Sequence, residues 1–306
     1  MKKLKTVSIV LFIAAVILFG GYIAKEKTTK DPTGPVITID SENITVSVRD
    51  GKEALLKGVT AADARDGDVT DSIYVETIGP MNEDGLRTVS YAAFDSDGHV
   101  SHALRTMSYT DYTPPVFHFD KHLVYTAGTT KLTDGITAQD CLGADLTGQV
   151  RALFDGSENV RLVGEYPAML RVYDSFGGCA EIPVVYEICN ADVYRNLPAV
   201  VLTDYLLYVK KGENFDPYDY VDYITINGKK YKPVTEGGTY GSEEESDSDT
   251  ERTIDRNLIE MTGKVDTNIP GCYELIYSLN DEAHETGKGI SRLYVVVTEG
   301  GARTDG

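Results

Sequence analysis

The stretch GLRTVSYAAFDSDGHVSHALRTMSY, residues 85–109, decides the fold, because the chain contains it three times. The related stretches are GEYPAMLRVYDSFGGCAEIPVVYEI from Gly164 and GCYELIYSLNDEAHETGKGISRLYVVV from Gly271. Each alternates apolar and polar residues, reaches an aspartate in a turn that contains Gly or Asn, and returns in a second alternating run. A period of two is typical of a half-buried strand. Each copy is therefore predicted to be a β-hairpin.

The apolar positions of each first run are the side chains that we expect to face a core. They are Val89, Tyr91 and Ala93 in the first copy, Tyr166, Ala168, Leu170 and Val172 in the second, and Tyr273, Leu275, Tyr277 and Leu279 in the third. The aspartates that end these runs are Asp95, Asp174 and Asp281.

Proline marks divide the rest of the chain around these hairpins. Pro35, Pro115 and Pro198 each precede an apolar run, at spacings of 80 and 83 residues. Chains made of short strands with regular turns form β-sandwiches. We therefore expect an all-β chain of three tandem sandwich domains, over residues 35–113, 114–191 and 192–300, with DYTPP (111–115) as the first joint, a tether at 25–34 and a tail at 301–306.

The third domain differs from the other two. Asn227-Gly228, between alternating residues, predicts a short hairpin. The segment 236–256 is rich in acidic residues and serine and has no apolar period, so it is predicted to be a disordered insert. Such an insert can recruit a basic partner, or it can be an unselected addition at a permissive loop tip.

Residues 1–24 have a different composition. Three lysines precede an apolar run from Val7 to Ala24 that carries no charge. Eighteen apolar residues in a helix just span a bilayer core of about 30 Å. We expect an N-terminal transmembrane anchor, hence a single-pass cell-membrane protein with extracellular C-terminal domains, and a cleaved signal peptide is the alternative.

The exported part is strongly acidic. The whole chain has a net charge of −19, and the three lysines of the first segment leave −22 for the remainder. Nucleic acids are poor partners for such a surface. The expected partners are the membrane, through the first helix, and a protein or glycan ligand at the cell surface.

Three motifs carry a family resemblance over about residues 35–299. The order PVITID, GVTAADARDGDVTDSIYVE and GLRTVSYAAFDSDGHVS resembles the bacterial Ig-like domain family of surface proteins, which also occurs in a pesticidal crystal protein and is related to hyalin repeats. VDTNIPGCYELIYSLND in the third domain is the best local match. The resemblance implies Ig-like sandwiches that serve as spacers or adhesive modules on exported proteins.

An aspartate-rich loop in the first domain suggests calcium. Alternating carboxylates with a glycine suit Ca²⁺, which takes six to eight oxygen ligands. The hairpin turn that shares this pole adds two more, so the candidate ligands are Asp63, Asp66, Asp68, Asp71, Asp95 and Asp97. The alternative is that Asp and Gly are the residues that tight turns require. No other cofactor is expected.

Two of the four cysteines are candidates for a disulfide. Aligned repeats place Cys141 opposite Ala64 and Cys179 opposite Val100, in two loops that lie at the same pole of an Ig-like sandwich. A Cys141–Cys179 bridge is predicted, and Cys189 and Cys272 are not expected to pair with each other.

Other polar clusters give weaker indications. His118, Asp120 and His122 share one strand face and could bind a transition metal, but no fourth ligand is evident. Tyr218, Tyr220 and Tyr223 can form an aromatic binding platform or belong partly to the core.

Motifs of the common enzyme classes are missing from the sequence, including G-x-S-x-G, H-E-x-x-H, S-x-x-K and the P-loop. The expected function is therefore a non-enzymatic binding or spacer module of the bacterial surface. The alternative is a carbohydrate-binding accessory protein of a cell-envelope hydrolase system.

Overall fold

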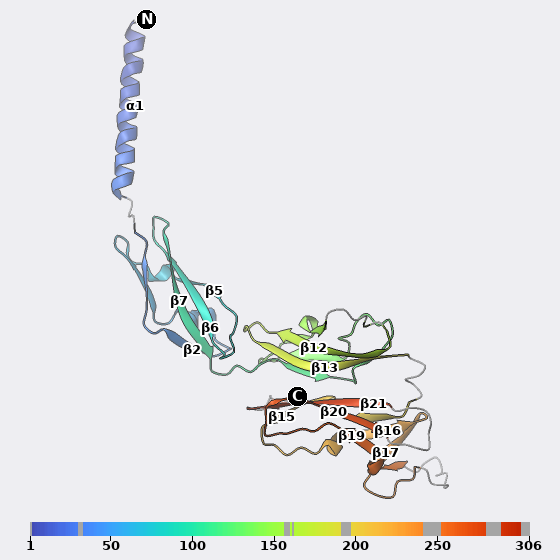
Figure 1. The fold of residues 1–306 in the computed structure, drawn as a ribbon. Helices are drawn as coiled ribbons and strands as arrows, with labels where there is room; N and C mark the ends of the chain where they lie inside the picture. Colours follow the sequence, from blue (N-terminus) through green and yellow to red (C-terminus); the bar gives the residue numbers. More distant parts are fainter. Residues whose placement is uncertain are drawn as a thin grey trace. The chain divides into compact units, whose positions relative to one another are not determined.

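The computed structural model describes residues 2–29, 33–155, 160, 162–190, 197–240, 252–279 and 289–300. The chain forms two compact units, Met1–Tyr112 and Thr113–Gly306 (Figure 1). The division falls inside the predicted DYTPP joint. Each unit is described by itself below.

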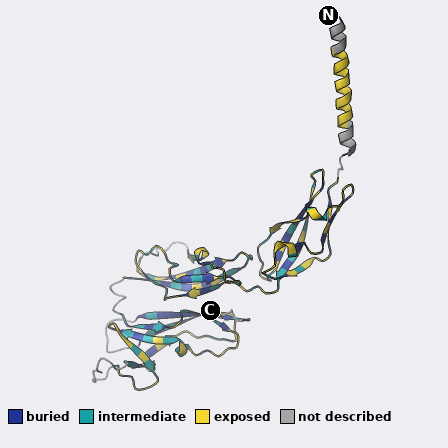
Figure 2. Ribbon diagram, turned by 180° about the vertical axis from the view of Figure 1, so that it is seen from behind, coloured by how far each residue is buried: buried dark blue, intermediate teal, exposed yellow. Residues whose placement is uncertain are grey.

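The first unit begins with one long helix, α1 (Lys2–Thr29). Its side chains from Ser8 to Ile23 are exposed on all sides (Figure 2). Within the described residues, no helix is both long enough and apolar enough to cross a membrane. The transmembrane anchor predicted over residues 1–24 is therefore not supported.

After the helix, the first unit is a sandwich of two sheets. One sheet has the order β1-β3-β4 and the other the order β2-β7-β6-β5. Its strands are β1 (Val36–Ile39), β2 (Asn43–Val46), β3 (Val59–Asp63), β4 (Gly67–Asp68), β5 (Tyr74–Ile78), β6 (Arg87–Phe94) and β7 (Val100–Tyr109). Short 3₁₀ turns cover Lys52–Leu56 and Thr70–Ser72.

The second unit contains two further sandwiches. The second sandwich pairs a β10-β8 sheet with a β11-β12-β13-β9 sheet. Its elements are β8 (Val116–Phe119), β9 (Val124–Thr126), β10 (Ile136–Gln139), the 3₁₀ turn Thr147–Gln149, β11 (Arg151–Phe154), β12 (Gly164–Tyr173) and β13 (Cys179–Cys189).

The third sandwich has sheets of order β14-β16-β17-β18 and β15-β21-β20-β19. Its strands are β14 (Ala199–Leu202), β15 (Leu206–Lys210), β16 (Val221–Ile226), β17 (Lys229–Val234), β18 (Thr253–Asp255), β19 (Ile259–Thr262), β20 (Gly271–Leu279) and β21 (Ile290–Thr298). Short 3₁₀ turns cover Pro217–Tyr220 and Arg256–Leu258. The cut between the second and third domains at 191/192 stays a prediction, since residues 191–196 lie outside the described part.

The three predicted hairpins are confirmed as antiparallel strand pairs. They are β6 with β7, β12 with β13, and β20 with β21. The first two close through short turns, whereas the turn of the third, with Asp281, lies outside the described residues. The mostly β architecture follows from this repeat.

The third sandwich was predicted to differ from the others by a short hairpin at Asn227-Gly228 and by a disordered insert at 236–256. Asn227 and Gly228 both adopt positive φ, 51° and 74°, as a tight hairpin turn between β16 and β17 requires. The disorder predicted for 236–256 is wrong at its C-terminal end, because β18 pairs with β17 and Ile254 is fully buried. The burial of Ile254 in the core thus orders this end of the segment, although most of the residues around it are polar. Residues 241–251 lie outside the described part.

The alternating positions of the hairpins face the cores, as predicted. Val89, Tyr91 and Ala93 are completely buried, and so are Leu170, Val172 and Tyr277. Tyr273 is the exception, because it is half-buried. Figure 2 shows the buried residues on the strands of each sandwich.

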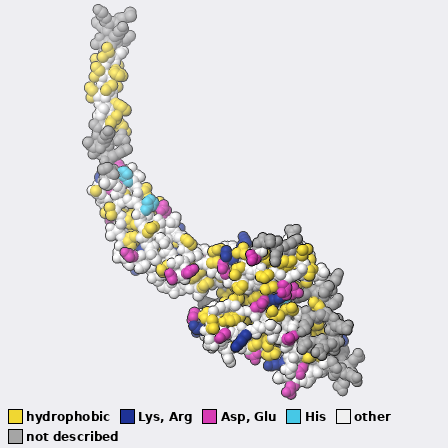
Figure 3. All heavy atoms as spheres, viewed as in Figure 1, with side chains coloured by type: hydrophobic (Ala, Val, Ile, Leu, Met, Phe, Trp, Pro, Cys, Tyr) yellow, Lys and Arg dark blue, Asp and Glu magenta, His cyan; other side chains and the backbone are white. Residues whose placement is uncertain are grey.

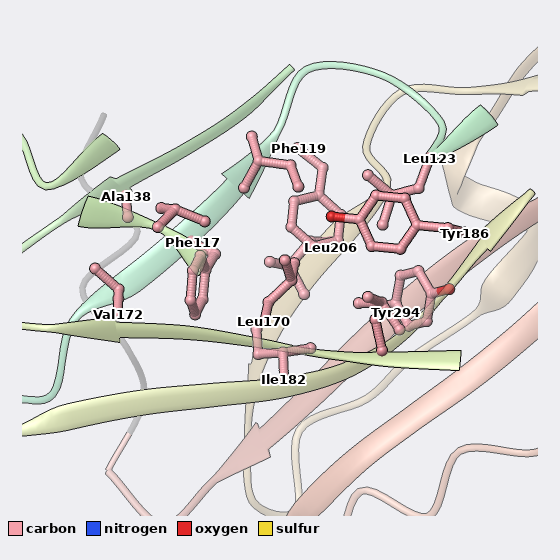
Figure 4. Close-up of a cluster of buried hydrophobic side chains, with 14 of the residues drawn as sticks. Phe117, Phe119, Leu123, Ala138, Leu170, Val172, Ile182, Tyr186, Leu206 and Tyr294 are labelled. Atoms are coloured by element: carbon pink, nitrogen blue, oxygen red, sulfur yellow. The ribbon is translucent and has the colours of Figure 1, made fainter. Parts of the chain in front are cut away.

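The cores of the second and third sandwiches are not separate. Leu206 of β15 and Tyr294 of β21 belong to the hydrophobic cluster of the second sandwich. Figure 4 shows Leu206 and Tyr294 in the same cluster as Leu170, Ile182 and Tyr186. A fully buried apolar side chain of this size contributes about 1.5–3 kcal/mol. The second unit is therefore held together by shared core packing.

Two buried tyrosines of the second unit differ in one hydrogen bond. The Tyr277 hydroxyl donates to the carbonyl of Pro217 at 2.8 Å, whereas the Tyr186 hydroxyl has no hydrogen-bond partner among the described residues. We predict that Tyr277→Phe lowers the free energy of unfolding by about 1 kcal/mol, because the part-buried carbonyl of Pro217 loses its donor. Tyr186→Phe is expected to leave stability unchanged or higher. Urea unfolding of both variants checks this, and equal losses would contradict it.

Candidate functional site: a groove in the second unit

The aspartates of the predicted calcium site lie in two loops at one pole of the first sandwich. The Asp66 carboxylate accepts hydrogen bonds from the backbone N–H and the hydroxyl of Ser96, at 2.7 and 2.9 Å. The Arg65 guanidinium donates to Asp97 at 2.6 Å. These contacts join the 63–68 loop to the 95–99 turn. Arg65 thus supplies positive charge at the pole where calcium was expected.

Three of these six carboxylates, those of Asp63, Asp68 and Asp95, hold the backbone of their own turns. Asp63 Oδ1 accepts from the N–H groups of Arg65 and Asp66, and Asp95 Oδ1 from those of Asp97 and His99. Asp140 and Asp174 do the same at the equivalent positions of the second sandwich. This is the hydrogen bonding that favours aspartate in turns. The repeated aspartates are therefore structural.

Asp95 also pairs with the ring of His99, at 2.7 Å from Oδ2 to Nδ1. Burial alone would raise the pKa of Asp95, but hydrogen bonds from His99 and Asp97 outweigh it and hold the pKa below its usual value. The carboxylate is therefore ionised at neutral pH and committed to its turn.

In the part of the chain that the structure describes, no three His, Cys, Asp or Glu side chains form a group able to hold a metal ion. Calcium binding by the first unit therefore stays a prediction.

If calcium binds there, 1 mM CaCl₂ is expected to raise the melting temperature of the full chain, and Asp68→Asn is expected to remove that rise. Asp222→Asn in the third sandwich is the control. An unchanged melting temperature would end the idea.

The predicted Cys141–Cys179 disulfide is not formed, since all four cysteines are free thiols. Cys179, the first residue of β13, lies 3.8 Å from the carbonyl of Ala180. Burial raises the pKa of both thiols, and the charge of Asp174 raises both further. Both cysteines therefore lie near the same turn, as the repeat alignment indicated, but without a bond between them.

The predicted tyrosine platform is dispersed. Tyr218 and Tyr220 lie in a 3₁₀ turn, not on a strand, and both pack against the core of the third sandwich. Arg256 lies over the Tyr218 ring at 4.2 Å, and Lys230 over the Tyr223 ring at 4.1 Å. Because cations of the same chain cover two of the rings, the three tyrosines do not form an open stacking surface.

The two histidines predicted to share one strand face are also dispersed, since His118 lies on β8 and His122 lies beyond its end. His118 Nε2 lies 3.2 Å from Asp120 on an exposed face, whereas His122 Nε2 accepts the backbone N–H of Arg292. The His122 ring stacks on Tyr205 with centroids 5.9 Å apart. His122 therefore serves the packing of the third sandwich against the second.

A buried arginine lies at the contact between these two sandwiches. The Arg292 side chain is 4 % exposed, and its guanidinium lies 2.7 Å from Glu165 and 3.1 Å from Glu274. Glu187 is 3.8 Å away. The side chains of Glu165, Glu187 and Glu274 are 53 %, 22 % and 33 % exposed, so solvent partly screens these ion pairs. Arg292 is an electrostatic contact between the two sandwiches, and it was not among the residues predicted from the sequence.

Two tyrosine hydroxyls complete the contact. Tyr208 accepts the backbone N–H of Phe117 at 2.8 Å, and Tyr294 accepts that of Val185 at 2.8 Å. Both acceptors come from the third sandwich and both donors from the second. Burial raises the pKa of each tyrosine far above its ordinary value, so both hydroxyls stay protonated.

Beside this contact lies a groove of about 640 Å³. Its floor is the outer face of β11, β12 and β13, and its other wall is the start of β20 with Tyr294 of β21. The lining is mostly apolar and includes Leu153, Phe154, Pro167, Met169, Pro183, Val185 and Tyr273. A volume of about 300–1,000 Å³ with an apolar lining and few polar groups is typical of a ligand site.

The polar groups of the groove are mostly acidic. They are Asp155, Glu181 and Glu274, with Arg171 paired to Glu181. Cys272 also lines the groove, but burial, with a smaller effect of Glu274, raises the pKa of its thiol to about 11. A thiol that stays protonated at neutral pH is a poor nucleophile. Cys272 is therefore poorly suited to act as a nucleophile in this groove.

His122 gives the second unit a pH dependence. Burial, with the nearby positive Arg292, lowers its pKa to about 3, against about 6.5 in an unfolded chain. The unfolded state thus binds a proton between these values that the folded state does not, so His122 makes stability fall as pH drops from about 6.5 toward 3.

We predict that His122→Gln reduces this loss, measured as the urea midpoint at pH 7 and pH 4.5 relative to wild type. His118→Gln, at an exposed position, is the matched control and should keep the wild-type profile. Identical pH profiles for all three proteins would contradict the assignment.

Comparison with known proteins agrees with the predicted resemblance. Residues 224–293 match the family described as "Bacterial surface protein, Ig-like domain". The chain is also 30% identical over 152 residues to the pesticidal crystal protein Cry22Aa of Bacillus thuringiensis. That match covers 47% of this chain and 21% of the relative, so the chain spans about a fifth of the relative's length.

Solved structures give only distant likenesses. CBM51-2 in complex with GlcNAc and INT domains from Clostridium perfringens ZmpB is 22% identical, covering 46% of this chain and 29% of that one, with a TM-score of 0.21. The lipoprotein BT2262 from Bacteroides thetaiotaomicron is 20% identical over 35% of this chain and 40% of its own, with a TM-score of 0.22. At these TM-scores neither likeness carries an argument.

The sequence match covers β17, β18, β19 and β20, together with the end of β16 and the start of β21, all within the third sandwich. Residues 224–293 of the third sandwich therefore match the bacterial surface Ig-like family.

Proposed function

We propose that this chain is a non-enzymatic binding module of the bacterial surface, and that the groove of the second unit holds its partner. The groove carries the proposal, because it combines an apolar floor with a few charged groups on two sandwiches that share a hydrophobic core. The family match at 224–293 supports a surface location for the module.

The shared core makes this groove a preformed site. Its two walls belong to different sandwiches, and Tyr294, the Arg292 cluster and the His122–Tyr205 stack fix one against the other. A site that is already in its bound shape loses little conformational entropy on binding. The same shared core would also suit a structural spacer, which is the alternative role for a module of the bacterial surface.

The test is capture of cell-envelope material by the immobilised full chain. We predict that Leu153→Glu, a charge placed on the 42 % exposed floor of the groove, lowers the captured amount at least several-fold. Leu104→Glu is the matched control, since Leu104 is an exposed leucine of the first unit. Protease or periodate treatment of the envelope fraction then separates protein from glycan partners.

Equal capture by both variants would place binding outside the groove. No capture by any of the proteins would favour the spacer role over binding.

A further inference from the structure

The outer face of the β11-β12-β13 sheet has an unusual composition. A sheet that buries one face in a sandwich normally presents polar side chains on the other. Here the floor of the groove is a ladder of cross-strand neighbours: Leu153 pairs with Met169, Met169 with Pro183, and Pro167 with Val185. The rows on either side of it are charged: Arg171 pairs with Glu181, and Glu165 pairs with Glu187. The inner face of the same strands is already fully used by the core.

The repeat provides an internal reference for this face. The positions of the first sandwich that correspond to Pro167, Met169 and Val185 are Thr88, Ser90 and Thr106, on β6 and β7. Three polar residues of the first sandwich are thus replaced by apolar ones in the second, and the third has Glu274 and Ile276 at the first two of these positions. The third sandwich accounts for the change at Val185, which Tyr294 contacts, whereas Pro167 and Met169 line the open groove and are available to something else that contacts this face.

Charge limits what that contact can be. Among the described residues that line the groove, the acidic side chains are Asp155, Glu181 and Glu274, against one basic side chain, Arg171. A second cavity of about 410 Å³ shares Glu181 and adds Glu299. Its lining is again apolar, with Pro114, Pro115, Ile182 and Val296. Figure 3 shows hydrophobic and acidic side chains next to one another on the second unit.

We propose that the ladder and its acidic rim bind an extended peptide that carries Lys or Arg beside apolar residues. Its apolar side chains would cover Leu153, Met169 and Pro183, and a cationic group would meet Asp155, which is exposed at the rim. Glu181 and Glu274 already form ion pairs with Arg171 and Arg292, so Asp155 is the acidic group of this lining that is open to the peptide.

A sugar fits this lining less well than a peptide. Carbohydrate needs many hydrogen-bond groups, whereas the floor consists of aliphatic side chains and prolines. The hydroxyl of Tyr273 already donates to Ile269, and that of Tyr294 is bonded to Val185. The inference rests on the proposed binding function and specifies the partner of the same groove.

The test uses the full chain and dye-labelled nine-residue peptides, followed by fluorescence anisotropy. The probe alternates proline and leucine and has arginine near each end. The first comparison peptide has glutamate in place of arginine, and the second has serine in place of leucine. We expect micromolar binding of the probe and roughly tenfold weaker binding of each comparison peptide, since a close charge pair is worth about 1–4 kcal/mol.

Two variants locate the site. Asp155→Lys reverses an exposed charge at the rim, and Met169→Ser restores the residue of the first sandwich at that position. Each is expected to weaken probe binding about fivefold or more, because one removes the charge complementarity and the other interrupts the ladder. Asp222→Lys, an equal charge reversal on β16 outside the groove, should leave binding unchanged.

Three results would overturn the inference: no binding at 1 mM probe, equal binding of the arginine and glutamate peptides, or equal losses in Asp155→Lys and Asp222→Lys. If envelope capture persists and still depends on Leu153 while the probe fails, the binding function stands and the peptide assignment falls. If envelope capture fails while the probe binds through the groove, the peptide assignment stands and the envelope-binding function falls.

Discussion

Unpaired backbone at the edges of the second sandwich is the constraint on which the second unit depends. β8 has a partner on one side only, and β9 covers only the last three residues of β13. Buried N–H groups on such edges need acceptors, and open edges also invite pairing with other chains. Tyr208 and Tyr294 supply the acceptors from the third sandwich. Their rings fill apolar space at the same time, so one pair of residues meets both needs.

The repeat was readable from the sequence because hairpins are local. Alternation at Val89, Tyr91 and Ala93 identifies a buried strand face without knowledge of any distant residue, and Asn227-Gly228 specifies its turn in the same way. The packing of the third sandwich on the second was not readable. It joins residues about a hundred positions apart, such as Tyr294 with Val185, and Tyr294 looks like any other alternating strand residue. Arg292 did give a signal, as a charge inside the apolar run ISRLYVVV.

The candidate site shows the same limit. The sequence pointed to aspartates, cysteines and tyrosines, which are the residue types that chemistry uses most. In the structure, Asp63, Asp95 and Asp174 hold turns, and the three tyrosines are covered or packed. The groove residues are chemically plain, and only their position on an outer face makes them notable. Alternation alone does not say which face of a strand is buried. A comparison of Met169 with Ser90 across the repeat would have shown that the outer face is more apolar in the second sandwich than in the first.

The shared core also governs how this protein can be cut and recombined. Domains of tandem proteins are usually treated as cassettes, separable at the repeat boundary that the sequence displays. Here a chain ending after residue 190 would lose Leu206 and Tyr294 from its own hydrophobic cluster and the acceptors of Phe117 and Val185. The smallest exchangeable piece on this side of the DYTPP joint is therefore the pair of sandwiches. Insertion, deletion or grafting is tolerated at that joint sooner than at the boundary between the second and third repeats.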